Sequence, residues 1–309
     1  MSEFIEIPSS GKDSAPTWPQ RFRPASFCAG VFCTGFSLVA LFWTVDDWRA
    51  DDLGATALAL SLTVMMTIVA AGMFERGGFH RFGLHPRIRQ CRDDLHGPGI
   101  EIPYVRILPV QLSVVFSCIT ILGAFMIRAS NRPDGAMLLA RHELPYSGSF
   151  IAWTTCATVA VCALPFLIHP RGFTRIHADG IRRRTTWLVR RGVSDVFVRW
   201  DEIQEVAADV YTVSGRGGST HNPLIRLHVS GYEPTPPRVA HDKPDSFTVP
   251  AYVLVSEPNT LLGLVDRLHR CPDDCHLVTT PEGPELLRPL PVRERLRIAR
   301  KIPRQQWEW

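Results

Sequence analysis

Apolar residues lie in long runs in the first half of the chain and in short alternating runs in the second half. Four stretches, 26–45, 53–74, 107–127 and 150–168, contain no Asp, Glu, Lys or Arg. Because an α-helix rises 1.5 Å per residue, about 20 such residues cross the roughly 30 Å hydrocarbon core of a bilayer. Backbone groups in lipid must be satisfied within their own segment, so the pattern predicts a bundle of four transmembrane helices over residues 26–168.

The arginines between these stretches orient the predicted bundle. The second link, 75–106, and the region after the fourth stretch are rich in arginine, whereas the first and third links hold few basic residues. Because Lys and Arg accumulate in cytoplasmic loops, we predict a multi-pass protein of the plasma membrane with both termini in the cytoplasm. Residues 1–25, rich in Pro and Ser, predict a disordered cytoplasmic tail.

A short motif occurs twice, each time directly after a predicted membrane helix. Gly78-Phe79-His80-Arg81 is followed by the turn-prone pair His85-Pro86, and Gly172-Phe173-Thr174-Arg175 by Asp179-Gly180. Both patterns are typical of a strand that leads into a hairpin. We therefore expect the link 75–106 to be hairpin-like, and the chain to contain two helix-helix-hairpin copies, with chance similarity as the alternative.

Short segments separated by turn residues follow residue 171. They predict strands over 173–177, 181–189, 196–200, 204–211, 224–229 and 247–255, with a flexible glycine-rich loop over 214–222. Apolar residues at helical spacing between 258 and 271 predict one amphipathic helix. The predicted fold is therefore a four-helix membrane bundle, a small cytoplasmic β-rich domain over 171–271 closed by one helix, and a basic tail over 272–309.

Three segments of the second half resemble bacterial pleckstrin-homology-like (PH-like) domains. They are Asp179-Gly180-Ile181, the run Val198-Arg199-Trp200-Asp201-Glu202-Ile203, and the helix that starts near Pro258. Such domains often follow transmembrane helices in actinobacterial multi-pass membrane proteins of unknown function. The resemblance implies a curved sheet close to the membrane, and it implies no catalytic residue.

The net charge of +4 reflects arginines gathered on one side of the predicted membrane. Basic residues near anionic head groups gain about 1 kcal/mol each, so these clusters are candidates for lipid or partner binding. The candidates are Arg182, Arg183, Arg184, Arg190, Arg191, Arg295, Arg297, Arg300 and Lys301. A role in topology alone is the alternative for the first cluster, and a solvated tail for the second. No nucleic-acid-binding module accompanies the charge, so we expect no nucleic acid partner.

Signatures of catalysis and of metal binding are incomplete. Gly215-Arg216-Gly217-Gly218 lacks the Lys-Ser/Thr of a phosphate loop, and the Cys and His residues over 269–276 lack a second pair of zinc ligands. We therefore expect no enzyme activity, cofactor or metal. The predicted function is a membrane anchor for a cytoplasmic PH-like domain that binds a protein partner or anionic lipid head groups, alone or as a homo-oligomer.

The alternative function is a small transporter or channel with a path through the four-helix bundle. Uncharged spans favour an anchor over a pump. A polar path would be lined by Thr63, Thr67, Ser113, Ser117, Thr154 and Thr158.

Overall fold

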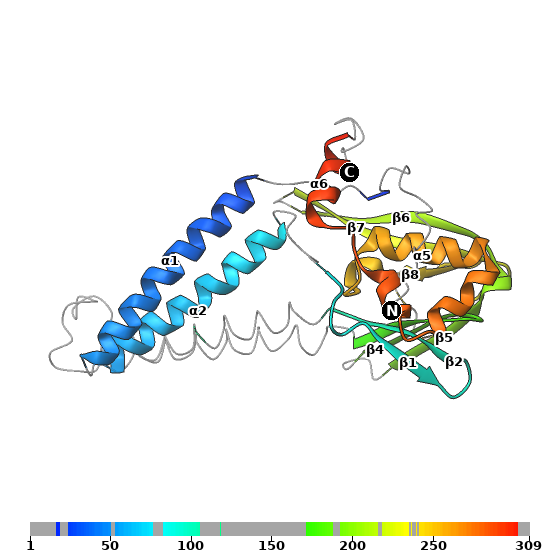
Figure 1. The fold of residues 1–309 in the computed structure, drawn as a ribbon, viewed down its shortest axis with the longest axis horizontal. Coiled ribbons are helices and arrows are strands. Elements are labelled where there is room, and N and C mark those ends of the chain that lie inside the picture. The colour runs from blue at the N-terminus through cyan, green and yellow to red at the C-terminus, as the bar shows by residue number, and fades with distance from the viewer. Residues whose placement is uncertain are drawn as a thin grey trace, which may run out of the picture.

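Two long helices form the N-terminal part of the computed structural model, and a β-rich part follows, in which the structure describes two α-helices and four 3₁₀ segments (Figure 1). The structure describes residues 17–18, 24–50, 53–76, 83–105, 118, 171–187, 192–215, 218–234, 236, 239 and 241–301. Helices α1 (Pro24–Arg49) and α2 (Leu53–Arg76) lie side by side. These bounds agree with the first two predicted stretches, which end where charged residues begin.

Many large apolar side chains of α1 are exposed. Phe32 is 74% exposed and Phe42 is 70% exposed. Within the described residues, α1 is the one helix that is long and apolar enough to cross a membrane, and α2 adds the shorter apolar stretch Leu58–Phe74. The structure thus has a helix-rich N-terminal part with one apolar helix of membrane length.

Four transmembrane helices are not supported by the part of the chain that the structure describes. The predicted stretches 107–127 and 150–168 lie outside the described residues, apart from position 118. The multi-pass topology and the cytoplasmic placement of the termini therefore stay predictions.

The first sheet contains five antiparallel strands in chain order. They are β1 (Arg89–Asp93), β2 (Gly97–Pro103), β3 (Arg171–His177), β4 (Gly180–Trp187) and β5 (Gly192–Arg199). Strand β2 pairs with β3, so that Pro103 lies opposite Phe173, and the Tyr104 N–H donates to the Gly172 carbonyl at 3.0 Å. The segment between them therefore leaves the sheet and returns to it at the same place.

The link 75–106 contains a hairpin, and His85-Pro86 begins a separate turn before it, closed by the hydrogen bond from the Ile88 N–H to the His85 carbonyl at 2.9 Å. Strands β1 and β2 pair around a turn at residues 94–96. They form the edge of the sheet on which the predicted domain 171–271 is built, so the sheet extends beyond that boundary. The sequence gives a weak signal there because β1 is five residues long and polar, as expected of an edge strand.

The second sheet has three antiparallel strands, β6 (Ile203–Gly215), β7 (Gly218–Val229) and β8 (Ser246–Val249). Strands β6 and β7 pair as far as Gly215 and Gly218, so the prediction of a flexible loop over 214–222 was wrong. Gly215 and Gly218 are the last paired residues of the two strands.

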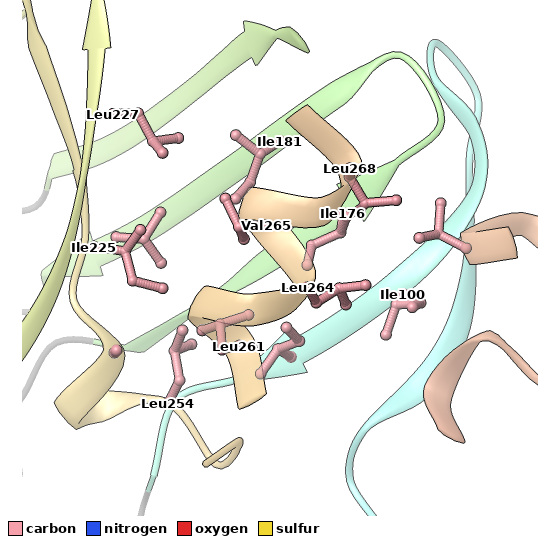
Figure 2. Packing of buried hydrophobic residues seen from close by; sticks show 14 of the residues in the cluster. Ile100, Ile176, Ile181, Ile225, Leu227, Leu254, Leu261, Leu264, Val265 and Leu268 are labelled. Atoms are coloured by element: carbon pink, nitrogen blue, oxygen red, sulfur yellow. The ribbon is translucent and has the colours of Figure 1, made fainter. Parts of the chain in front are cut away.

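Helix α5 (Pro258–Arg270) supplies the centre of the core (Figure 2). Its apolar face is set against isoleucines of the first sheet and Ile225 and Leu227 of β7. The buried core residues of α5 and the first sheet include Leu261, Leu264, Val265, Leu268, Ile100, Ile176 and Ile181. One amphipathic helix therefore covers both sheets, as the pattern over 258–271 predicts.

Among the described residues after α5, 272–301 form 3₁₀ segments and a helix, so the β-rich part continues into the region predicted as a basic tail over 272–309. The 3₁₀ segments η3 (Pro272–Thr279) and η4 (Gly283–Leu287) add Val278 and Leu287 to the core, where these side chains are 0% and 1% exposed. Helix α6 (Val292–Lys301) follows, where Val292, Leu296 and Ala299 are spaced as on one face of a helix. The apolar positions of η3 and η4 are too widely spaced to give a regular period, so the sequence pattern does not reveal them.

Candidate functional site

The three consecutive arginines of β4 do not form one surface. Successive strand residues face opposite sides of a sheet, so Arg182 and Arg184 face outward and Arg183 faces the core. The Arg183 side chain is fully buried, at 0% exposure. This placement corrects the prediction that Arg183 contacts lipid or a partner.

Arg183 is instead the centre of a buried polar cluster between the sheets. Its guanidinium donates to both oxygens of Asp242 and to the Thr248 carbonyl, and it lies 4.5 Å from the centre of the Phe247 ring. The Tyr232 hydroxyl donates to Asp242 at 3.1 Å, while burial and the neighbouring Asp242 carboxylate raise the pKa of Tyr232 to about 12. Burial alone would lower the pKa of Arg183, but Asp242 holds it above its usual value. The cluster therefore fixes residues 232–248 to β4.

The outward-facing arginines are neutralised by carboxylates from neighbouring strands. Arg182 forms two hydrogen bonds of 2.8 Å with Asp195 and a third with Asp93. Arg175 donates to Asp93 at 3.0 Å and to Glu101 at 2.7 Å. The Leu95 backbone N–H, together with Arg182 and Arg175, lowers the pKa of Asp93 to about 2, although burial opposes the shift. Cross-strand ion pairs therefore neutralise Arg182, which the sequence alone suggests as a lipid-binding residue.

The remaining members of the first arginine cluster are less constrained or lie outside the structure. Arg184 has an exposed side chain whose Nε is 3.9 Å from an Asp195 oxygen. Arg190 and Arg191 lie outside the described residues. Within the described part, therefore, the β4 arginines do not present a free basic patch.

We predict that Arg182→Ala weakens the fold slightly rather than changing lipid binding. The variant loses partly exposed ion pairs to Asp195 and Asp93, so the free energy of unfolding is expected to fall by about 1 kcal/mol. Chemical denaturation of the full chain measures this loss. A large loss of affinity for anionic vesicles with unchanged stability would contradict the structural role.

Helix α6 separates the C-terminal candidates into a buried residue and an exposed face. Arg295 is 8% exposed, and burial lowers its pKa while the charge of Glu257 opposes that shift. Arg293 and Arg297 are exposed and stand one helical turn apart. Arg300 and Lys301 belong to the same helix, and their side chains lie outside the described part. The exposed basic face thus begins with Arg293, which the sequence-based candidates omit, and Arg297.

Two histidines, His96 and His177, lie close together beside the β1–β2 and β3–β4 turns of the first sheet. His177 of β3 is 0% exposed, and neither of its ring nitrogens has a hydrogen-bond partner among the described residues. His96 stacks on Phe197 with ring centres 3.6 Å apart and pairs with Asp179 at 3.0 Å. Its ring centre is 5.6 Å from that of His177. Burial lowers the pKa of His177, although the charges of Asp179 and Asp93 oppose the shift.

The Cys and His residues over 269–276 do not converge. Cys271 is exposed, whereas Cys275 is buried and donates from Sγ to the Leu268 carbonyl at 3.5 Å. His276 lies on the surface, where its ring Nδ1 is 2.5 Å from the Asp273 carbonyl. Within the described ranges, no group of three His, Cys, Asp or Glu side chains is placed to hold a metal ion.

Two threonines assigned to a possible transport path contact α1 instead. Ser37 of α1 donates to the Thr63 carbonyl at 3.1 Å, and its hydroxyl is 2.8 Å from that of Thr67. Hydroxyl groups between helices in lipid commonly form such bonds. Ser113, Ser117, Thr154 and Thr158 lie outside the described residues. The described part of the predicted path therefore serves the packing of α1 on α2.

The N-terminal segment docks on α5, a contact that no local sequence pattern indicates. The Trp18 N–H donates to Asn259 Oδ1 at 2.9 Å, and Asn259 Nδ2 donates to the Trp18 carbonyl at 2.9 Å. The Trp18 side chain is partly buried against the hydrophobic core. Residues 17–18 are thus held in place within the segment predicted to be a disordered tail.

Comparison of the chain with protein-family models, curated proteins and solved structures found no match.

Proposed function

We propose that this chain is a non-enzymatic, multi-pass membrane protein that holds a PH-like domain against the cytoplasmic membrane surface, where a basic helix binds anionic lipid head groups. Five strands and three strands in two sheets, closed by α5, support the PH-like part. The exposed apolar surface of α1 supports the membrane part, because a soluble monomer rarely leaves such a surface uncovered.

The main support for the proposed topology is that the chain contacts the β-rich part both just before α1 and just after α2. Trp18, just before α1, is bound by Asn259 of α5, while β1 and β2, just after α2, pair with β3. If α1 crosses a bilayer, α2 must therefore cross back. Tyr104 and Gly172 are hydrogen-bonded, so the chain between them also starts and ends on one side. Two further crossings by 107–127 and 150–168 satisfy this condition, which supports four spans.

The lipid-binding surface of this proposal is α6 rather than β4. Arg293 and Arg297 are exposed, whereas Arg182 and Arg183 are engaged with carboxylates. Arg295 lies within electrostatic reach of Glu257, which caps α5 beside the Trp18 contact. Trp18 precedes α1 by six residues, so at most about 22 Å of extended chain separates this corner from the end of α1. Helix α6 therefore lies near the proposed membrane surface.

Labelling of single cysteines tests the topology. In a background with all eight native cysteines replaced by serine, we expect Ala50→Cys and Asp134→Cys to react with a membrane-impermeant maleimide in intact cells. Leu95→Cys, on the 82% exposed tip of the β1–β2 hairpin, should react only after permeabilisation. Labelling of Leu95→Cys in intact cells, or of Asp134→Cys only after permeabilisation, would contradict four spans with a cytoplasmic domain.

Hydrogen exchange tests the lipid contact in the full chain reconstituted into nanodiscs. Backbone amides of α6 are expected to exchange more slowly in discs that contain phosphatidylglycerol than in discs of phosphatidylcholine alone, and high salt should remove the difference. Combining Arg293→Gln with Arg297→Gln should remove it as well, whereas Arg92→Gln on β1 provides an exposed-arginine control. Equal exchange in both lipids would refute the head-group contact and leave the topology result unaffected.

A further inference from the structure

The start of α5 carries a binding arrangement for a peptide backbone. Asn259 offers its side-chain oxygen to the Trp18 N–H and its side-chain nitrogen to the Trp18 carbonyl, both at 2.9 Å. One amide therefore binds both the backbone donor and the backbone acceptor of a single residue. Contacts to backbone groups can bind a peptide, and pockets for its side chains then give specificity.

Glu257 fixes the orientation of this amide. Its carboxylate accepts from Asn259 Nδ2 at 3.0 Å, and a carboxylate cannot donate, so the nitrogen must lie on this side. The second Nδ2 hydrogen is then directed to the Trp18 carbonyl. Glu257 is 3% exposed and is itself held by the Thr260 backbone N–H at 2.6 Å and the Thr260 hydroxyl at 2.9 Å. The recognition group is thus preorganised by the cap of α5.

The occupant also contributes an aromatic side chain. The Trp18 indole packs, partly buried, against the core that α5 shares with both sheets. Aromatic side chains bury a large area at low entropic cost, which makes them common anchors in peptide interfaces. The contact thus combines two main-chain hydrogen bonds with one aromatic anchor.

We propose that the start of α5 is a peptide-binding site for a segment with an aromatic anchor, and that this chain's own Thr17-Trp18 occupies it in cis. The site goes beyond the proposed function and requires neither lipid binding nor a particular number of spans. Its occupation ties the beginning of α1 to the β-rich part, and release of Trp18 frees both the segment and the site.

Binding of a separate peptide to the emptied site tests this proposal. The probe is a fluorescently labelled peptide of residues 12–22, and the receptor is the detergent-solubilised chain that lacks residues 1–18, with binding followed by anisotropy. Saturable binding is expected, with much weaker binding to the full-length chain, because the tethered segment competes at high effective concentration. A peptide with Trp18→Ala should bind at least about tenfold more weakly.

Asn259→Ala in the shortened chain should weaken peptide binding about tenfold, since two hydrogen bonds are lost. Asn222→Ala on β7 is the matched control and should leave the affinity unchanged. If the shortened chain does not give a cooperative thermal transition, full-length Trp18→Ala replaces it as the receptor. Equal binding to the parent and to the receptor with the emptied site, or no binding to a folded receptor, would overturn the proposal.

Discussion

Replacing Arg183 with alanine is expected to lower the free energy of unfolding by about 3–5 kcal/mol. The substitution leaves the Asp242 side chain, which is 2% exposed, without its main counter-charge in the core. It also opens a cavity where the guanidinium now lies over the Phe247 ring. Thermal unfolding of the full chain, followed by circular dichroism in the aromatic range, measures the loss.

A double substitution separates the loss of charge pairing from the loss of volume. Arg183→Met combined with Asp242→Leu removes both charges and keeps apolar volume, and buried ion pairs replaced in this way often lose little stability. We therefore expect the double variant to recover most of the stability lost in Arg183→Ala. An Arg183→Ala protein as stable as the parent would show that the buried pair does not hold residues 232–248 against β4.

The Arg183 cluster shows where reading the sequence as local clusters fails. Three adjacent arginines suggest one basic patch, although the strand period of two already predicts that the middle one faces the opposite side. Ile181 and Thr185 flank Arg183 on that side, and both are buried. The partner, Asp242, lies in a Pro-rich segment between β7 and β8, so no local pattern indicates the pair.

Elements that depend on local periodicity were predicted well. The first two apolar stretches correspond to α1 and α2, the alternating segments to most strands of the β-rich part, and the helical spacing to α5. Pairing between distant segments was not predicted, because the contacts that stabilise it are made with residues far away in the sequence. Strands β1 and β2 are examples, because Glu101 of β2 can pair with Arg175 only when β2 lies beside β3.

The sequence indicated arginines as candidate site residues, but it did not reveal what each arginine contacts in the fold. Of the nine basic candidates, Arg297 is an exposed residue on a helix, whereas Arg182, Arg183 and Arg295 are engaged or buried. Carboxylates of neighbouring strands neutralise arginines when the strands pair in the matching register. That register is a property of the folded sheet. Trp18 and Asn259 are separated by most of the chain, so no local sequence pattern indicates that they form a site.

Lowering the pH below about 6.5 is expected to destabilise the β-rich part through His177. Burial lowers the pKa of His177 below its usual value of 6.5, so the folded protein binds a proton there less readily than the unfolded chain. Stability from this group is therefore complete above pH 6.5 and is lost as the pH falls from there towards the folded-state pKa. Urea denaturation at a series of pH values between 7 and 5 measures the slope.

The neighbours of His177 determine how strongly the folded state resists its protonation. Asp179 of the β3–β4 turn and Asp93 of β1 favour the charged ring, as does the Pro98 backbone of β2, whereas His96 disfavours it. Phe197 of β5 and the His96 ring cover the imidazole, and Gly99 leaves room for it, because a Cβ there would lie 2.8 Å from Nδ1. Protonation thus favours an opening of the His96 turn, which would let water reach the ring.

Substitution of His177 by leucine separates this effect from other acid-sensitive groups. The variant removes a buried ring whose nitrogens find no hydrogen-bond partner among the described residues, a feature that costs about 1–3 kcal/mol, so we expect it to be at least as stable as the parent at pH 7. Its stability should fall less steeply towards pH 5, while the part due to His241, whose pKa burial also lowers, remains. His228→Leu on β7 is the matched control. An unchanged slope in His177→Leu would mean that the ring is not the group through which acid opens this end of the sheet.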